Sequence, residues 1–181
     1  HAECNHHPDD GCPYPPAIVF DADGLCFSLE DYPDTAITTP HLGELKKIMQ
    51  TDDVNFSLNL NVFNKIQSLM GHGYNWGNYG SQIHIIKSFN TYIITKDMIY
   101  IMDRGPSVLS AAGTGDVLSG ILVSLLSQGY SKLDASILGT YLHAEAANYY
   151  IENISKDGMT ASDLIECIPH AFNKLREYNV N

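Results

Sequence analysis

Short apolar runs recur along the chain, separated by segments that contain glycine, proline or asparagine. Each run has the length of a strand buried on both faces, as found in parallel sheets. The last two runs flank Lys96 and Asp97, so they are expected to form a hairpin or to lie side by side. We expect strands at 17–20, 36–39, 83–86, 91–95 and 98–102.

Other stretches repeat apolar residues every three or four positions, which is the spacing of one helix face. This pattern predicts helices at 41–49 and 62–70, followed by a loop at 71–82 rich in glycine and asparagine. From Gly113 to Gly129 the chain is very apolar, with glycine suited to a turn at either end. A helix this apolar is expected to be buried on most of its surface.

Only helices are expected after this segment. Ser131 can cap one helix, and Thr160 or Ser162 can cap the last one. Pro169 is expected to mark a break or a second start, because proline lacks the N–H that continues a helix. Strands alternating with helices, and then helices only, predict an α/β domain of three layers with a mostly parallel sheet flanked by helices.

Composition and charge exclude several classes of protein. The chain has 181 residues, of which 44% are hydrophobic and 17% charged, and this fits one globular domain. Its apolar runs stay far below the ~20 residues of a membrane span, and its start does not read as a secretory signal, so we expect a cytoplasmic protein with no membrane partner. The net charge of −11 without a basic run argues against nucleic acid as a partner. A nucleotide is still compatible, because backbone N–H groups at a helix start can hold a phosphate.

Residues 1–16 follow no clear pattern and are expected to form a disordered leader, which assigns the domain to 17–181. The leader's histidines and cysteines lack the paired spacing of a metal site, so a metal site there is the less favoured alternative and we assign no metal ligands. Cys26 and Cys167 are expected to be reduced thiols. The leader residues concerned are His1, Cys4, His6, His7 and Cys12.

The strongest chemical signal is Gly113-Thr114-Gly115-Asp116, at the start of the apolar helix. The glycines permit close approach of a ligand, and the free N–H groups of a helix start suit a phosphate. A carboxylate repels phosphate, so Asp116 fits best as a general base or orienter for a neighbouring hydroxyl. The alternative is an aspartate stabilised by the helix dipole, with glycines that serve only the turn.

Three more polar groups follow predicted strands. The segment 21–24 (DADG) follows the first strand, the segment 39–44 (TPHLGE) follows the second, and Lys87 closes the third. Ligands of open α/β sheets collect at the carboxyl ends of the strands, so these groups are expected at one sheet edge. Each alone has an ordinary explanation as a cap, a turn or a lysine that reaches for solvent. Together they predict a ligand site.

In the order of these motifs, the chain resembles the NAD(P)H-hydrate dehydratases, members of the ribokinase-like superfamily. The motifs are FDADGL, TPHLGEL, a strand that ends in lysine, AAGTGDVLSGIL, YLHAEAA and MTASDLIECIP. The resemblance extends from Ile18 to about Leu175. TPHxGE together with AAGTGDVLSG is fairly specific, whereas GTGD alone would indicate only the superfamily.

The resemblance implies a Rossmann-like, ribokinase-like fold and a repair reaction. Members of the family remove the water that NADH or NADPH has gained on its nicotinamide ring, at the expense of ADP or ATP. Mg²⁺ is implied too, carried mostly by the phosphates and water, and so is a homo-oligomer. Activation of the ring hydroxyl by a phosphoryl group, while Asp116 takes its proton, would fit the kinase chemistry of the superfamily.

The same resemblance assigns roles to individual residues. Asp116 is the catalytic carboxylate and contacts the hydrated nicotinamide, and His41 contacts the hydrated dinucleotide. Asp21 and Asp23 match acidic positions near that substrate. The adenine nucleotide is assigned to Lys87, Ser88, Phe89, Asn90, Thr91, Gly113, Thr114 and Gly115.

Three departures from the family pattern bear on these expectations. The family's long N-terminal part has no counterpart before residue 17, so we expect a fold that is incomplete there, with an open sheet edge. Ser88 stands where the family has glycine, which restricts the loop after Lys87. Cys26 stands where family members often have asparagine.

Other functions stay open at this point. A kinase for a small alcohol such as a vitamin precursor would share the glycine-rich helix start and the base. A nucleotide-binding remnant without catalysis would fit the missing N-terminal part and Ser88. A purely structural domain would require every sheet-edge motif to be a coincidence.

Some residues outside the motifs receive ordinary interpretations. His143 is expected to be a satisfied helical histidine rather than a ligand. His72, Tyr74 and Trp76 are expected on a surface loop, although such a loop could also cover the site.

Overall fold

The computed structural model of the chain describes residues 16–70, 81–103 and 105–178. The interpretations made for the leader, both disorder and a metal site, lie outside the described residues. So does the possible lid at 71–80.

A five-stranded sheet forms the centre of the described fold, in the order β1-β2-β3-β4-β5. β1, β2 and β3 are parallel, whereas the pairs β3–β4 and β4–β5 are antiparallel. The sheet is therefore mixed, and parallel only in its first half, because tight connections permit antiparallel pairing alone. The strands are β1 (Ile18–Phe20), β2 (Ala36–Thr38), β3 (Ile83–Ile86), β4 (Thr91–Ile94) and β5 (Ile99–Met102).

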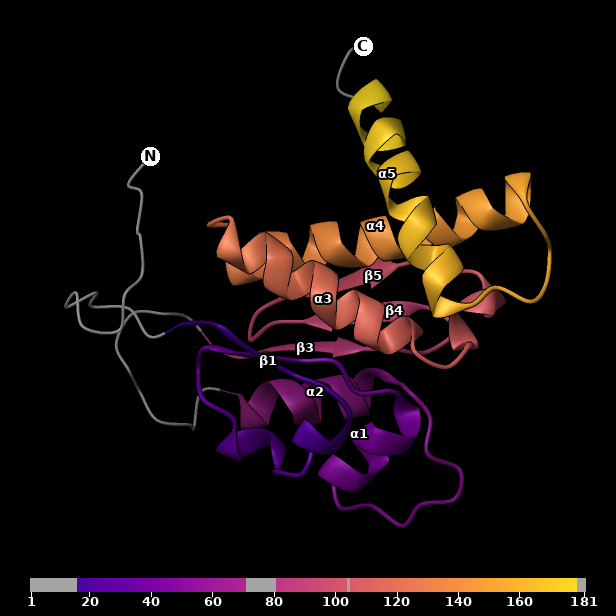
Figure 1. Cartoon of the computed structure of the whole chain (residues 1–181). Helices are drawn as coiled ribbons and strands as arrows, with labels where there is room; N and C mark the ends of the chain where they lie inside the picture. Colours follow the sequence, from indigo (N-terminus) through magenta and orange to yellow (C-terminus); the bar gives the residue numbers. More distant parts are fainter. Residues whose placement is uncertain (1–15, 71–80, 104, 179–181) are drawn as a thin grey trace.

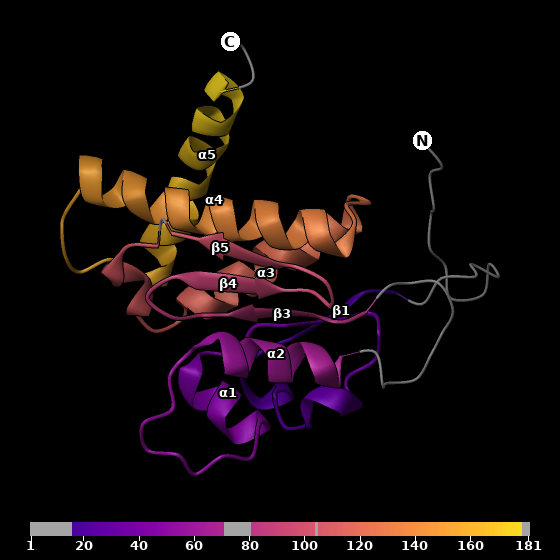
Figure 2. The same ribbon diagram turned by 180° about the vertical axis from the view of Figure 1, so that it is seen from behind.

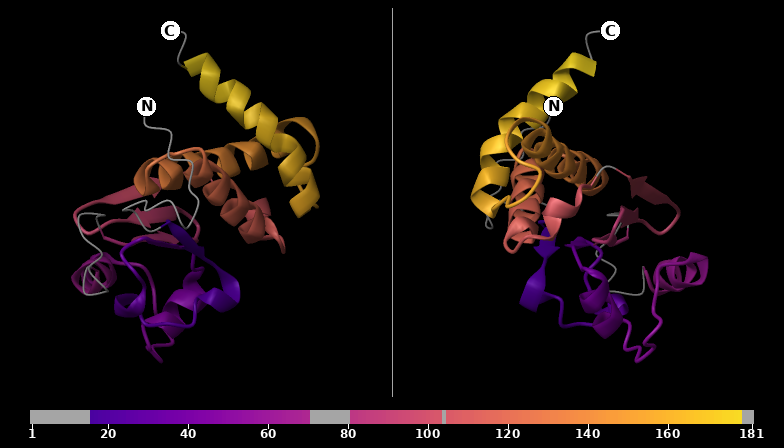
Figure 3. Two further views of the ribbon diagram at one scale, coloured as in Figure 1. Left: turned by 60° about the vertical axis from the view of Figure 1, so that its left-hand side comes forward. Right: turned by 90° about the vertical axis from the view of Figure 1, so that its right-hand side faces the viewer.

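Helices cover both faces of this sheet, and the predicted α/β architecture is confirmed. In Figure 1, α1 and α2 lie below the sheet and α3 and α4 lie above it. Figure 2 shows α2 and α4 on opposite sides of β3 and β4. In Figure 3, α5 packs outside this layer and its C-terminal end projects away. The helices are α1 (Leu42–Ile48), α2 (Leu60–Leu69), α3 (Thr114–Ser127), α4 (Lys132–Asn153) and α5 (Ala161–Tyr178), with 3₁₀ turns at Ala22–Gly24 (η1), Leu29–Asp31 (η2) and Ser107–Ser110 (η3).

Alternate residues of the central strands fill separate cores. Ile86 packs with Leu45 of α1 and Ile66 of α2, in the layer below the sheet. Ile85, its neighbour in β3, packs with Leu118 of α3 in the layer above. Because both faces are buried, β3 is apolar except for His84, whose Nδ1 lies 2.7 Å from the hydroxyl of Thr38.

The helix ends follow the predicted chemistry. The hydroxyl of Ser131 accepts from the N–H of Asp134 at 3.1 Å at the start of α4. Thr160, not Ser162, does the same for α5. After α3 the chain turns at Gly129, whose φ of +88° suits glycine.

Two helix predictions were wrong. Pro169 lies inside an unbroken α5. The carbonyl that loses its intrahelical donor belongs to Ile165, which is 54% exposed, so water can replace the missing bond. α3 is not buried on most of its surface: Val123, for example, is 53% exposed, because α5 covers only part of its outer side. None of the described helices combines the length and the hydropathy that a bilayer crossing requires.

Candidate functional site

Two strand ends and a helix start meet at one edge of the sheet. Nζ of Lys87, just after β3, donates to Oδ1 of Asp21, just after β1, at 3.0 Å. The second oxygen of that carboxylate, Oδ2, accepts from the hydroxyl of Ser119 at 2.8 Å. Ser119 lies one helical turn beyond Gly115 on the same face of α3. The predicted convergence of these motifs is confirmed, although they are far apart in sequence.

Gly115 is required by this close approach. A Cβ atom there would lie 3.2 Å from Nζ of Lys87 and 3.6 Å from Oδ2 of Asp21. Gly113 caps α3 with a φ of +83°, in the left-handed region. Between them, the Thr114 hydroxyl donates to the carbonyls of Leu109 and Ala111, so it holds the turn and is not directed at a ligand.

The carboxylate of Asp21 is fixed in its ionised form. Burial by itself would raise its pKa, but hydrogen bonds from Thr39, Lys87 and Ser119 and the positive charge of Lys87 outweigh it and lower the pKa. Asp21 thus neutralises Lys87 and aims its ammonium across the first turn of α3. The Asp21 carboxylate contacts Lys87 and Ser119 and does not line the open cavity beside them.

His41 caps α1 and adjoins the same cluster. Its Nδ1 accepts from the N–H groups of Gly43 and Glu44, at 3.0 and 3.2 Å, while the Glu44 carboxylate accepts from the N–H of His41. Nδ1 is therefore an acceptor, so the ring proton is on Nε2. The ring lies close over Gly43, where a Cβ would be 3.0 Å from its Cε1. His41 also pairs with Lys87 in an isolated parallel bridge, which places both at the same rim.

A cavity of about 650 Å³, here called the β3–α4 cavity, opens beside this cluster. Its walls come from the loop after β3, the segment around η3, the start of α3 and the middle of α4. Seven of the predicted residues line it: His41, Lys87, Ser88, Phe89, Thr91, Thr114 and Gly115. Its other lining residues are Gly105, Pro106, Ser107, Leu109, Ser110, Ala111, Leu118, Thr140, His143 and Ala144.

Other predicted residues face elsewhere. Gly113 and Asp116 line a groove of about 530 Å³ between α3 and α5, here called the α3–α5 groove. Asp116 is exposed. Asn90 is half-buried and is absent from the lining of the β3–α4 cavity.

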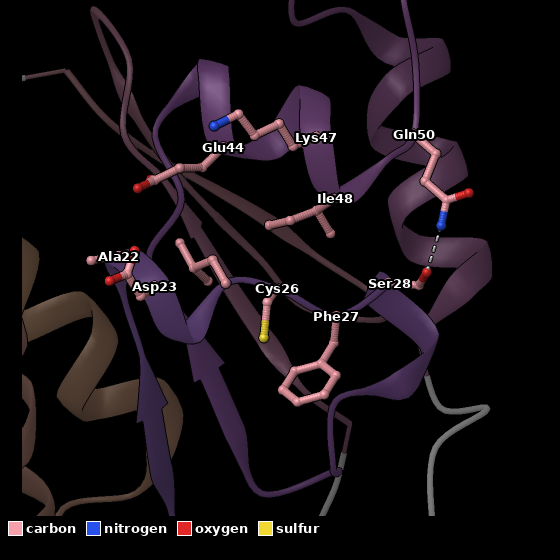
Figure 4. Close-up of a pocket in the computed structure, with 10 residues that line it drawn as sticks. Ala22, Asp23, Cys26, Phe27, Ser28, Glu44, Lys47, Ile48 and Gln50 are labelled. Carbon is pink, nitrogen blue, oxygen red and sulfur yellow. Dashed lines mark hydrogen bonds between the residues drawn. The ribbon is translucent and has the colours of Figure 1, made fainter.

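Asp23 does not join the Lys87–Asp21–Ser119 cluster, and its place near the substrate stays a prediction. Ala22 takes a left-handed φ of +47°, and the resulting turn directs Asp23 away from Asp21. It lines a separate cavity of about 440 Å³ between the DADG turn and α1, together with Cys26. Figure 4 shows this cavity, with Asp23 and Glu44 at one end and a hydrogen bond between Gln50 and Ser28 at the other.

Sequence reasoning missed the contributions of Ser119 and α4. Ser119 could have been found, since it lies four residues after Gly115 in the same motif. His143 belongs to the YLHAEAA motif, but the sequence could not assign its contact, because that contact depends on how α4 packs. Its Nε2 lies 2.8 Å from the carbonyl oxygen of Thr114, in the wall of the β3–α4 cavity.

Comparison with known proteins agrees with this geometry. The family model described as NAD(P)H-hydrate dehydratase matches residues 6–170. The bifunctional NAD(P)H-hydrate repair enzyme Nnr of Dictyoglomus turgidum is 30% identical over 169 residues, which are 90% of this chain and 31% of that protein. The chain therefore spans about a third of this relative.

Solved structures share the fold. The ADP/ATP-dependent NAD(P)H-hydrate dehydratase from Bacillus subtilis, co-crystallised with ATP and Mg²⁺ and soaked with CoA, superposes with a TM-score of 0.66 at 21% identity. The match covers 86% of this chain and 55% of that one. A ribokinase-like superfamily protein from Enterococcus faecalis gives a TM-score of 0.67 at 19% identity, over 86% and 52% of the two chains.

The family match begins inside the segment that sequence patterns left unassigned and ends within α5. It includes all the residues of the sheet edge and of the start of α3. Since it extends over most of the chain, this protein belongs to the NAD(P)H-hydrate dehydratase family.

Proposed function

We propose that this chain supplies the nucleotide-binding half and the catalytic carboxylate of a nucleotide-dependent NAD(P)H-hydrate dehydratase. The observation that carries the proposal is the Lys87–Asp21–Ser119 cluster, fixed against Gly115 at the start of α3. A held ammonium beside the free N–H groups of a helix start is suited to phosphate. Family membership supplies the reaction class, removal of water from hydrated NADH or NADPH.

The adenine nucleotide is assigned to the β3–α4 cavity. Its phosphates would lie toward Lys87 and Gly115, and its nucleoside between the segment around η3 and α4, where Leu109, Leu118 and Ala144 offer apolar contact. The B. subtilis relative was crystallised with ATP and Mg²⁺. Ser88 lines the cavity directly after Lys87, so its side chain is compatible with a place in this wall.

Asp116 is assigned as the base. It lies in the first turn of α3, next to Gly115, and is exposed. In the proposed reaction its carboxylate takes the proton of the ring hydroxyl as that oxygen receives the phosphoryl group. Loss of the resulting phosphate, with loss of a ring proton, restores the reduced nicotinamide. A carboxylate that has no cationic partner in the described part of the chain is suited to accept this proton.

Magnesium would enter with the phosphates. Among the described residues, no group of three or more histidine, cysteine, aspartate or glutamate side chains could hold a metal ion. Both oxygens of Asp21 are already engaged. The chemistry that Mg²⁺ supplies, charge neutralisation on the phosphates, does not require a protein cage.

A second candidate is a nucleotide-binding module without turnover. It is favoured by Ser88, which follows Lys87 in the wall of the cavity where the family pattern has glycine, because a side chain there restricts the loop. Both candidates bind the adenine nucleotide, but only the dehydratase converts the hydrated dinucleotide.

The test is recovery of reduced-nicotinamide absorbance from hydrated NADH, with ADP or ATP and Mg²⁺. The dehydratase hypothesis predicts nucleotide-dependent recovery that Asp116→Asn abolishes and that the matched control Asp97→Asn leaves unchanged, because Asp97 is exposed in the turn between β4 and β5. Nucleotide binding by calorimetry, without recovery, would support the module instead. Equal activity of the native chain and Asp116→Asn would contradict the role of Asp116.

A further inference from the structure

His143 is buried in the wall of the β3–α4 cavity, and within the described part of the chain only one of its two ring nitrogens has a hydrogen-bond partner. Nε2 lies 2.8 Å from the carbonyl oxygen of Thr114. A carbonyl oxygen carries no hydrogen, so Nε2 must hold the ring proton and donate it. In the neutral ring this makes Nδ1 an acceptor.

The neutral form is the stable one at physiological pH. Burial lowers the pKa of His143 to about 4; the hydrogen bond to Thr114 acts in the opposite direction, and the nearby charge of Lys87 lowers the pKa further. Nδ1 has no hydrogen-bond partner among the described residues. The ring is 8% exposed and lines the cavity, so that this acceptor is available from the cavity side.

The two hydroxyls that α3 and α4 contribute to the lining, those of Thr114 and Thr140, already donate elsewhere. The hydroxyl of Thr140 donates within α4, to the carbonyls of Ser136 and Ile137. The Thr114 hydroxyl donates to carbonyls before α3. Apart from Gly115 and His143, the other lining residues of these two helices, Leu118 and Ala144, are apolar. A ligand in this part of the cavity therefore meets an apolar surface with one unsatisfied acceptor.

We propose that Nδ1 of His143 accepts a hydrogen bond from the 6-amino group of adenine and selects adenine over 6-oxo purines. This inference rests on the proposed function, which places the nucleoside in this cavity. A planar base fits the apolar wall, and its exocyclic amine supplies the donor that the wall lacks. A 6-oxo group would set an acceptor against an acceptor and leave both unpaired.

The test compares the affinities of ADP and inosine diphosphate by calorimetry, with Mg²⁺, on the native chain. Inosine diphosphate carries the 6-oxo group. We expect ADP to bind about 10- to 100-fold more tightly, the usual effect of one lost hydrogen bond and one unpaired buried acceptor.

Two variants separate selection from packing. His143→Gln keeps an amide N–H within reach of the Thr114 carbonyl but has no atom at the position of Nδ1, so it is expected to lose most of the preference for ADP. His143→Asn keeps an amide oxygen near Nδ1 and loses the donor to Thr114. It is expected to keep the preference and to unfold at a lower temperature.

An unchanged ratio of the two affinities in His143→Gln would overturn the inference, as would equal binding of both nucleotides by the native chain. If His143→Gln instead abolished a preference for ADP over 2′-deoxy- or 3′-deoxy-ADP, the donor would be the ribose and the inference would be wrong. A native chain that bound neither diphosphate would contradict the proposed function itself, and this inference with it. If His143→Gln fails to fold, the ratio of ADP to inosine diphosphate affinity in the native chain and in His143→Asn still tests the inference.

Discussion

The two sides of the first turns of α3 differ in how they use their polar groups. On one side, Gly115 and Ser119 face an ion pair in which every oxygen of Asp21 has a partner. On the other side, Asp116 is exposed at the rim of the α3–α5 groove, whose wall is largely apolar. A phosphate site needs a cation and N–H groups that are held in place, whereas a base needs a carboxylate whose charge is not already neutralised. The tetrapeptide 113–116 can supply both the phosphate site and the base, because its residues project from different sides of α3.

The largest expected effect concerns two buried histidines that the fold keeps neutral. His143 supports the first turn of α3, and His84, fully buried in β3, lies 2.7 Å by its Nδ1 from the hydroxyl of Thr38. Burial lowers the pKa of each to about 4, from 6.5. Between these values the folded chain binds fewer protons than the unfolded chain. Stability is thus complete above pH 6.5 and is lost as the pH falls toward 4, by up to about 3 kcal/mol for each histidine.

Urea unfolding between pH 7.5 and 4.5 measures this dependence. His84→Gln should reduce the slope of unfolding free energy against pH by about half, because the contribution of His143 stays. The lowered pKa of Asp21 does not enter this window, since its contribution is lost only below the ordinary value of 3.8. A flat profile from pH 6.5 to 4.5 would show that neither histidine is held neutral by the fold.

Lys87→Met tests the paired side directly. Loss of a charge-assisted contact to phosphate should weaken ADP binding about 10- to 100-fold. Asp21→Asn should have a smaller effect, about three- to tenfold, because the lysine stays but is no longer held. Calorimetry with ADP and Mg²⁺ measures both. Asp116→Asn is the matched control on the exposed side of α3 and should bind ADP within about twofold of the native chain. If all three variants lost ADP affinity equally, the two sides of α3 would not differ in function.

The smallest expected effects come from a pair of glycines on the same helix. Gly115→Ala would place a Cβ 3.2 Å from the Lys87 ammonium and should weaken ADP binding several-fold by displacing it. Gly120→Ala meets nothing within 4 Å, and should instead raise the free energy of unfolding by about 0.5–1 kcal/mol, through the helix propensity of alanine. The measurements are ADP affinity and urea unfolding. Weaker binding in Gly120→Ala would indicate that the α3–α5 groove belongs to the nucleotide site.

Local rules predicted the elements well because each depends on neighbouring residues. Ser131 and Thr160 cap helices, and Gly129 ends one, through hydrogen bonds and dihedral angles within a few positions. The mixed character of the sheet was underestimated, because the apolar pattern of a strand does not state its direction. The burial of α3 was overestimated, because its apolar residues do not reveal how much of it α5 covers.

For the site, the sequence indicated that the residues after β1, β2 and β3 share an edge with Gly115. It could not show that Asp21 is a partner of Lys87, or that η1 turns Asp23 away from both. The first fact depends on atoms 66 positions apart, and the second on the left-handed conformation of Ala22, which its residue type does not predict. The roles of the site residues stay predictions until the variants are measured.

From the amino-acid sequence alone we could predict the family, the α/β class and candidate residues for phosphate binding and proton transfer, because these depend on motif order, periodicity and side-chain chemistry. Tertiary structure alone decided which of those residues meet. It paired both oxygens of Asp21 and left Asp116 exposed. It also brought His143 from α4 to the Thr114 carbonyl, which fixes the ring proton on Nε2. The physical reason is that hydrogen bonds, ion pairs and burial act over a few ångströms in space, whatever the separation along the chain.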